Sequence, residues 1–402
     1  MLKNVVIVND FAYIQGGASK VAIDTANVLS RKGLRVLFFT GDMNLTTKKV
    51  LDKNIEIIST NQGEALRDSN KLRGIKNGLY NGKAKRQFKK VLNELNPEET
   101  IIHVHGWTKC LSSSVFKAAF NMKFKTVLTL HDYFTACPNG GFFNYKRNKI
   151  CHLCPMSMKC VSTNCDSRNY GFKVFRVVRQ LIQNKIVGLP RKIRYVIYLS
   201  DLQWSVLSSN FKKLLKAQKL LNPITSQPLD KKNKSNKGKY YLYVGRLSQE
   251  KGIKVFCEGF SQLGLPAVVV GDGPLLEELS KKYKTIDFVG WKNSSDIKKY
   301  MQEAKALVFP SLWYEAQPLV PIEAESVGLT CILSDKSSAK EFVKNKDYVY
   351  DGDNVECLKG VVDRFEFCYN NVRVEPRKMQ DNYCKELMKF YEGCMKGQNE
   401  IW

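Results

Sequence analysis

The sequence of 402 residues lacks several features that would place it in a membrane or outside the cell. No apolar run approaches the about 20 residues that a bilayer-spanning helix needs. The first residues, MLKNVVIVND, lack the basic start and long apolar core of a secretory signal. We expect them to form a first buried strand. No internal repeat and no nucleic-acid-binding module is recognisable. Because it lacks a membrane span and a secretory signal, the sequence predicts a folded protein of the cytoplasm.

Acidic residues are scarce in the first half of the chain. Residues 1–222 hold 37 Lys and Arg against 13 Asp and Glu, a net charge of +24 out of +26 for the whole chain. Two stretches, 67–90 and 173–194, interleave these bases with apolar residues, as segments lying on anionic lipid do. A solvated basic surface and, more remotely, nucleic-acid binding are the alternatives. We therefore expect this half to be peripheral on the inner face of the cytoplasmic membrane.

Cysteines are numerous for a cytoplasmic protein, in which disulfides rarely persist. Five of the twelve fall between Cys137 and Cys165, and the last four of these have the spacing C-x2-C-x5-C-x4-C. Such a set can close a tetrahedral zinc site and order a loop that has no core of its own. Reduced or redox-labile thiols and an iron–sulfur cluster remain alternatives. The predicted structural zinc ligands are Cys151, Cys154, Cys160 and Cys165.

The length suits two α/β domains, each with parallel strands and Rossmann-like topology. We predict an amino-terminal domain over residues 1–222 with a Cys-rich insertion at 137–165. The composition then shifts to Pro, Asn, Ser and Lys, which is typical of a linker. A second domain is predicted over 223–378. A final helix over 379–402, with apolar residues at helical spacing, completes the chain.

The stretch from Ala306 to Asp335 organises the second domain. It reads as a strand, an aromatic loop containing Glu315, a helix from about Val320 that ends before Gly328, and a second strand. Such units bind ligands at the carboxyl ends of their strands. We place Glu323 in the first helical turn, where it and Glu315 could both face a sugar nucleotide. One carboxylate would bond the sugar, and the other would bond the ribose.

Positions suited to a diphosphate occur at the ends of earlier strands. In the motif GRLSQEKG, Gly245 forms a turn, and Arg246 and Lys251 supply a planar fork and a point charge before a helix. Three of the four histidines, His103, His105 and His131, lie at the ends of two predicted strands of the first domain. Isolated histidines in such places are usually structural.

The chain resembles the retaining glycosyltransferases of family 4, which have the GT-B fold of two Rossmann-like domains facing across a cleft. EAQPLVPIEA, from Glu315 to Ala324, matches their Glu, seven residues, Glu signature, but has Ala, Gln and Pro where Gly, Phe and Gly are usual. The resemblance also covers the GRLSQEKG motif, the GDGP element, the GGA turn and the HD pair. It implies nucleotide-sugar binding at Gly271, Gly273, Gly16 and Gly17, and at His131, which would bond a sugar hydroxyl.

The resemblance implies a reaction as well as a fold. A sugar would pass from a nucleotide diphosphate sugar to a saccharide acceptor, expected to be lipid-linked, in the synthesis of O-antigen or capsule. Glu315, His131, Arg246 and Lys251 are the predicted catalytic residues, and no cofactor is required for catalysis. The last helix is expected to cross back onto the first domain. Alternatives are a sugar-nucleotide epimerase, a sugar-binding protein without catalysis and, on charge alone, a zinc-ordered nucleic-acid binder.

Overall fold

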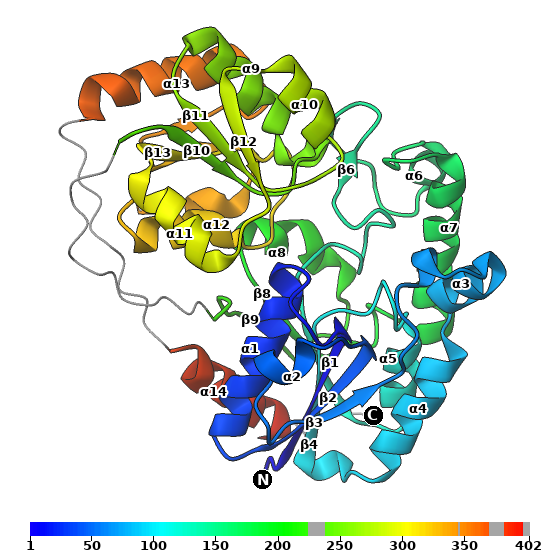
Figure 1. Cartoon of the computed structure of the whole chain (residues 1–402). Helices are drawn as coiled ribbons and strands as arrows, with labels where there is room; N and C mark the ends of the chain where they lie inside the picture. Colours follow the sequence, from blue (N-terminus) through cyan, green and yellow to red (C-terminus); the bar gives the residue numbers. More distant parts are fainter. Residues whose placement is uncertain (224–237, 345, 370–381, 397–402) are drawn as a thin grey trace. The chain divides into compact units, whose positions relative to one another are not determined.

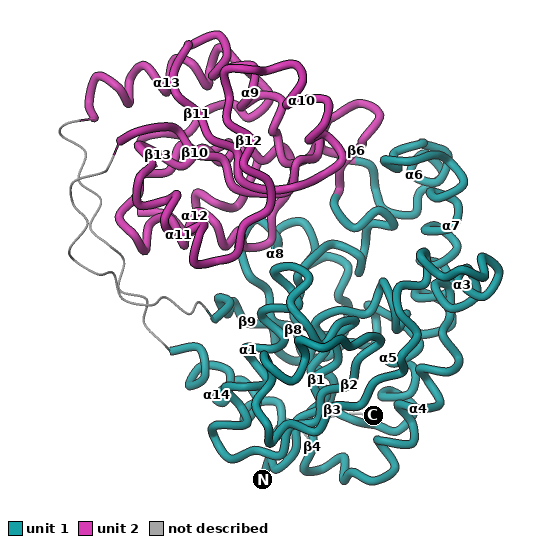
Figure 2. Tube along the Cα trace, viewed as in Figure 1, with its two compact units in different colours: residues 1–141, 153–223, 381–402 teal, residues 142–152, 224–380 magenta. Residues whose placement is uncertain are grey.

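The computed structural model describes residues 1–223, 238–344, 346–369 and 382–396. The chain divides into two compact units (Figure 2), one of residues 1–141, 153–223 and 381–402 and the other of residues 142–152 and 224–380. The predicted domain boundary, between 222 and 223, lies next to the division at 223. The predicted Cys-rich insertion, however, is shared, because residues 142–152 group with the second unit.

The first unit is built on a seven-stranded sheet with the order β3-β2-β1-β4-β5-β8-β9, in which every neighbouring pair is parallel. Its strands are β1 (Asn4–Phe11), β2 (Arg35–Asp42), β3 (Glu56–Ser59), β4 (Thr100–Val104), β5 (Lys125–Thr129), β8 (Tyr195–Tyr198) and β9 (Lys216–Lys219). Its α-helices are α1 (Gly17–Arg31), α2 (Thr47–Val50), α3 (Lys71–Leu79), α4 (Gly82–Asn93), α5 (Ser114–Asn121), α6 (Met158–Ser162), α7 (Tyr170–Leu181), α8 (Asp201–Leu207) and α14 (Tyr383–Lys396). A π-helix, η3 (Ile182–Val187), continues α7.

Hydrophobic patterning explains why the first unit begins as it does. The strand β1 is buried almost throughout, as parallel strands covered on both faces are. The helix α1 buries Val21, Ala22, Ala26 and Leu29, which recur at helical spacing. The strand order reverses between β1 and β4, so loops leaving their carboxyl ends lie at a topological switch point.

The carboxyl-terminal helix α14 belongs to the first unit (Figures 1 and 2). Its Tyr383 hydroxyl lies 2.7 Å from Thr25 Oγ1, and its Tyr391 hydroxyl lies 2.6 Å from His103 Nδ1. Leu387 and Phe390 are buried in the same core. The part of the predicted last helix at 379–381 and 397–402 lies outside the described residues.

The second unit contains a six-stranded parallel sheet with the order β12-β11-β10-β13-β14-β15. Its strands are β10 (Tyr241–Val244), β11 (Ala267–Val270), β12 (Ile286–Gly290), β13 (Ala306–Phe309), β14 (Cys331–Ser334) and β15 (Val349–Tyr350). Its α-helices are α9 (Ile253–Leu263), α10 (Leu276–Lys282), α11 (Ser294–Glu303), α12 (Leu319–Ser326) and α13 (Val355–Cys368). A hairpin of β6 (Phe143–Asn144) and β7 (Lys149–Ile150) also belongs to this unit. The sheet order reverses between β10 and β13.

The helix α7 corrects our expectation that both basic stretches present their bases on the surface. Lys173 and Arg179 of α7 are buried, and Arg176 pairs with the buried Asp166. Three of its apolar side chains, Val174, Val178 and Leu181, are exposed, whereas Val177 is buried. Periodicity alone could not reveal which stripe faces inward, because the partners of Lys173 and Arg176 lie in the irregular segment that precedes the helix. None of the helices in the described part of the chain combines the length and hydrophobicity needed to cross a membrane.

Candidate functional site

The candidate site lies where β10 and β13 of the second unit end. The loop after β10 leads through Gly252 into α9, and the loop after β13 starts at Pro310. Gly252 has a φ of +69°, and a Cβ placed there would lie 1.8 Å from the Pro310 carbonyl oxygen. The Leu312 amide donates to the Glu250 carbonyl at 2.9 Å. The two loops are therefore held together at the switch point of the sheet, where parallel α/β sheets bind ligands.

Lys251 and Glu315 meet across these two loops. Lys251 Nζ lies 2.7 Å from Glu315 Oε1, and Ser311 Oγ and Trp313 Nε1 each donate to the same oxygen at 2.8 Å. The Glu315 side chain is 11% exposed, and that of Lys251 is 24% exposed. Three donors on one carboxylate oxygen fix its position, and fixed charges of this kind can stabilise charge that develops in a bound molecule.

The other predicted diphosphate positions surround the end of β10. Arg246 is exposed, and within the described ranges its side chain forms no ion pair, so it is available to an anion. A Cβ on Gly271 would lie 1.9 Å from the Gly245 carbonyl oxygen, and one on Gly273 would lie 2.5 Å from the Leu247 carbonyl oxygen. Gly271 and Gly273 thus allow the loops after β10 and β11 to pack backbone to backbone.

Glu323 lies farther along its helix than the sequence predicts. The helix α12 begins at Leu319, so Glu323 is in the second turn and not in the first. Pro318 occupies the position before the helix, and no side chain caps the helix start. The amide groups of its first turn remain open to a ligand, except at Pro321, which has no N–H. Glu323 is partly exposed on this helix.

In the first unit, Gly16 and Gly17 lie at the start of α1, after the end of β1. Both are exposed, and no side chain caps the helix. Nothing lies within 4 Å of a Cβ built on Gly16. The positive end of the α1 dipole is therefore open, as it is in helices that bind phosphate.

The three histidines of this unit form one cluster. His103 Nε2 lies 2.7 Å from Thr129 Oγ1, while its Nδ1 faces the hydroxyl of Tyr391 on α14. The His103 and His105 rings lie 4.2 Å apart, and His105 Nδ1 lies 2.9 Å from His131 Nε2. Burial lowers the pKa of His131 to about 4 and, with a smaller effect of the charge on His131, that of His103 to about 3. The rings are therefore neutral near pH 7.

The proton positions in this cluster follow from its hydrogen bonds. His105 Nε2 is buried and has no partner among the described residues. Because a buried N–H without a partner is rarer than an unpaired acceptor, the His105 proton belongs on Nδ1, which donates to His131 Nε2. His131 then carries its own proton on Nδ1. His105 thus holds His131 in a defined tautomer.

Sequence reasoning missed several residues that build these sites. Ser311 and Trp313 orient Glu315, and Asp10 accepts hydrogen bonds from the amides of Lys109, Cys110 and Leu111 at 2.8–3.0 Å. Burial raises the pKa of Asp10. The position of Asp10 near the carboxyl end of a buried strand was the available signal, because polar residues at strand ends often line sites.

The four predicted zinc ligands do not form a metal site in the structure. No three His, Cys, Asp or Glu residues in the described ranges are placed so that they could hold a metal ion. Cys151 belongs to the second unit, and Cys154 is exposed. Cys160 and Cys165 are buried, and the ammonium group of Lys173 lies against both sulfur atoms. Structural zinc stays a prediction.

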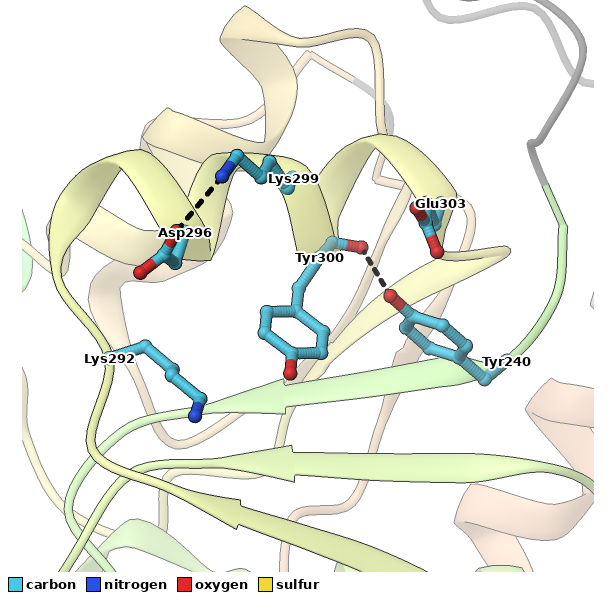
Figure 3. A pocket seen from close by; sticks show the side chains of 6 residues that line it. All are labelled: Tyr240, Lys292, Asp296, Lys299, Tyr300 and Glu303. Atoms are coloured by element: carbon cyan, nitrogen blue, oxygen red, sulfur yellow. Dashed lines mark hydrogen bonds and ion pairs between the residues drawn. The ribbon is translucent and has the colours of Figure 1, made fainter.

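A separate pocket of about 370 Å³ lies along α11 of the second unit (Figure 3). The Tyr240 hydroxyl donates to the Tyr300 carbonyl at 3.1 Å, and Lys299 pairs with Asp296 at 3.1 Å. None of the predicted donor-binding residues lines this pocket. Its lining residues are Tyr240, Lys292, Asp296, Lys299, Tyr300 and Glu303.

Comparison with known proteins agrees with this geometry. Over 130 residues the chain is 33% identical to the UDP-Gal:alpha-D-GlcNAc-diphosphoundecaprenol alpha-1,3-galactosyltransferase of Escherichia coli, a match that covers 29% of this chain and 32% of that enzyme. The match thus spans about a third of the length of that curated relative.

Solved structures share the whole fold. Sucrose-phosphate synthase from Thermosynechococcus elongatus matches with a TM-score of 0.64 at 16% identity, covering 98% of this chain and 96% of its own. Anabaena Alr3699/HepE in complex with UDP-glucose matches with a TM-score of 0.61 at 14% identity, covering 99% and 100%. These likenesses confirm the predicted α/β, GT-B fold class. Residues 226–385 match the family described as glycosyl transferases group 1.

Proposed function

We propose that the protein is a retaining glycosyltransferase that moves a sugar from a nucleotide diphosphate sugar to a saccharide acceptor. The convergence of Lys251 and Glu315 at the switch point carries this proposal. Arg246, which follows the same strand β10 and forms no ion pair with a described residue, is the second proposed cation. UDP is the proposed nucleotide, because the Anabaena neighbour was solved with UDP-glucose. The Escherichia coli relative acts on a sugar linked to diphosphoundecaprenol, which supports a lipid-linked acceptor in surface polysaccharide synthesis, of O-antigen or capsule.

Each residue of the site has a proposed role. Arg246, Lys251 and the open helix start at α12 would stabilise the leaving diphosphate, with Gly245, Gly271 and Gly273 allowing it to approach the backbone. Glu315 would bond the sugar and offset positive charge at its anomeric carbon. The acceptor would attack from the face that the diphosphate leaves, and a leaving phosphate oxygen would take the acceptor proton.

In the first unit, His131 Nδ1–H would donate to a sugar hydroxyl of the donor. The open start of α1 at Gly16 and Gly17 would lie near the diphosphate and the acceptor. Glu323, which is partly exposed on α12, would bond the ribose diol. These chain groups suffice for the proposed chemistry, so a catalytic cofactor is not part of the proposal.

Incubation of the purified protein with a panel of UDP-sugars and a lipid diphosphate saccharide tests the proposal. We expect a product whose new linkage keeps the anomeric configuration of the donor, measured by NMR. Conversion of the donor alone to its epimer, without acceptor, would instead identify an epimerase. Donor binding with neither transfer nor hydrolysis would identify a sugar-binding protein.

The first unit also offers a surface for an anionic membrane, and we propose that the enzyme is peripheral on the cytoplasmic face. The helices α3 and α7 pack against each other. Their outer sides form the α3–α7 surface, in which Leu72, at 81% exposure, is the most exposed side chain. Exposed bases on α3 flank these apolar residues, and the pair of features fits lipid with anionic headgroups. The apolar residues of the α3–α7 surface are Leu72, Ile75, Val174, Val178 and Leu181.

We expect salt-sensitive binding to phosphatidylglycerol vesicles and little binding to phosphatidylcholine vesicles. The Val174→Ser, Val178→Ser double variant should weaken vesicle binding roughly tenfold, because it removes several buried methyl groups from the bound state. Leu45→Ser, at an exposed site outside the surface, is the matched control and should bind normally. Equal binding of the protein to both kinds of vesicle would contradict the proposal. Equal vesicle binding by the double variant and the control would contradict it as well.

A further inference from the structure

A pocket of about 200 Å³ in the first unit is lined by none of the residues proposed for sugar transfer. Its walls come from the loop after β5, from the end of η3 with the residues that follow it, and from the turn η4 (Ser208–Asn210). Three cationic residues line the pocket, and no acidic residue of the described ranges does. Its polar and cationic lining residues include Thr135, Asn184, Lys185, Arg191, Asn210 and Lys212.

The three cations of this pocket have no counter-charge of their own. Within the described ranges Lys185, Arg191 and Lys212 form no ion pair, and all three residues are exposed. Residues 167–223 hold twelve Lys and Arg and a single acidic residue, Asp201, which is itself paired with a lysine. The end of a helix attracts cations, but this explains at most the lysine in η3, because the other two cations follow η3 and η4.

Thr135 supplies an independent sign of a ligand. The residue is 1% exposed, and its Oγ1 is buried without a hydrogen-bond partner among the described residues. A buried hydroxyl without a partner costs stability, so native structures rarely keep one unless a bound molecule satisfies it. The surrounding wall is fixed, because Gln180 Nε2 donates to the Thr135 carbonyl at 3.3 Å and to Asn184 Oδ1 at 3.2 Å. The Nδ2 group of Asn184 is therefore left as a donor.

This set of groups fits a phosphate group. The cations supply positive charge, arginine supplies a planar fork that matches two phosphate oxygens, and the hydroxyl and amide supply further donors. The lack of carboxylates in the described lining disfavours a hard metal ion or a cationic ligand. A nucleic acid, which needs a succession of cations along its backbone, does not fit a pocket of this size.

We propose that this pocket binds a phosphate or diphosphate group, separately from the donor diphosphate at the end of β10. Arg191 would hold the group with its guanidinium fork, and Lys185 and Lys212 would balance its charge. Thr135 and Asn184 would donate hydrogen bonds to its oxygens. Two sources would supply such a group: free diphosphate, or the diphosphate of a lipid-linked saccharide. The second source rests on the proposed function, whereas the binding site itself does not.

Calorimetric titration of the whole protein with sodium diphosphate tests the site. We expect the Arg191→Ser, Lys212→Ser double variant to bind at least about tenfold more weakly, because each change removes a hydrogen bond to a charged group. Lys192→Ser, Lys213→Ser is the matched control, since it removes the same net charge at exposed neighbouring positions that do not line the pocket. Unchanged binding in the first variant would overturn the proposal. An equal loss in the control would overturn it too, because only the general positive charge would then matter.

Lys251→Met separates this site from the proposed donor site. It should weaken UDP-sugar binding but leave the diphosphate binding that depends on Arg191 and Lys212 in place. Loss of all diphosphate binding in folded Lys251→Met would refute a second site. Because the titration contains neither sugar donor nor acceptor, a failure of the transfer assay does not affect its result.

Thr135→Val tests the buried hydroxyl. It should weaken diphosphate binding about tenfold without lowering the melting temperature of the ligand-free protein, because a hydroxyl without a partner contributes nothing to folding. A lower melting temperature with unchanged binding would contradict the role proposed for Thr135.

Farnesyl diphosphate distinguishes the two sources of the group. Binding tighter than that of sodium diphosphate would indicate a lipid-linked ligand, and equal binding would indicate free diphosphate. Binding of neither compound would overturn the proposal.

Discussion

Charge removal at Glu315 should separate catalysis from stability. In Glu315→Gln the amide oxygen can still accept from Ser311, Trp313 and Lys251, so the loop after β13 should keep its shape. Lys251 is a quarter exposed and can turn to water, so we expect a loss of only about 1 kcal/mol in the free energy of unfolding. Turnover should fall by about 10²-fold to 10³-fold, the usual effect of removing one group that stabilises transition-state charge.

Truncation of Lys251, the partner of Glu315, should lower the free energy of unfolding more than Glu315→Gln does. Lys251→Met leaves the Glu315 carboxylate, 11% exposed, with two neutral donors and no cation. A hydrogen bond to a charged group contributes about 1.5–3 kcal/mol, and a fully buried broken pair costs more. Partial exposure of Lys251 places the expected loss near 2 kcal/mol. The double variant should be more stable than the sum of the two single losses predicts.

A second ion pair in the same unit provides a matched control. Lys254 and Glu278 also lie 2.7 Å apart, but both side chains are about half exposed. Glu278→Gln should therefore leave both turnover and the free energy of unfolding nearly unchanged. The assay is steady-state transfer from the true donor, with urea unfolding of each variant. Turnover of Glu315→Gln within about threefold of wild type would refute the role proposed for Glu315, whatever the unfolding data show.

Three further predictions concern the rest of the two units. Gly273→Ala should lower the melting temperature and weaken UDP-sugar binding, because its Cβ would meet the loop after β10. Gly360→Ala is the control: it lies in α13 with nothing within 4 Å of its Cβ, and should raise the melting temperature slightly. His105→Ala should release His131 from its Nδ1–H tautomer, which ¹⁵N NMR detects. His105→Asn, whose amide can donate in place of Nδ1, should restore that tautomer. An unchanged His131 signal in His105→Ala would contradict the assignment. Burial lowers the pKa of His103 to about 3 and that of His131 to about 4, so the free energy of unfolding should be highest above pH 6.5 and fall as the pH drops toward 4. Asp132 should partly offset this loss, because burial raises the pKa of its carboxyl group to about 6. Melting temperature against pH measures this, and His131→Gln should show the shallower slope.

The sequence predicted the parts of the structure that depend on local pattern. The run VVIV in β1, the apolar face of α1 and the βαβ unit around Glu315 each contain their whole signal within about thirty residues. Lys251 and Glu315 follow neighbouring strands, and the carboxyl ends of parallel strands meet at one edge of the sheet, which explains why the two residues lie together.

The failures concern residues whose partners are set by loop geometry, which a periodic sequence pattern does not encode. The helix α12 begins at Leu319, one residue before the predicted start, because a helix start without a capping side chain has no sharp signal in the sequence. Ser311 and Trp313 look like ordinary loop residues until the side chain of Glu315 is placed between them.

The helix α7 shows most clearly why pattern alone was insufficient. An amphipathic helix has two stripes, and the sequence cannot state which one faces the protein when the interior supplies partners for charge. Here the Cys-rich segment supplies them: sulfur for Lys173, and Asp166 for Arg176. Because those partners satisfy the cations, burying them costs little, and the apolar stripe is left for solvent or for another surface. The helix therefore faces the Cys-rich segment with Lys173 and contributes Val174 and Val178 to the α3–α7 surface on its outer side.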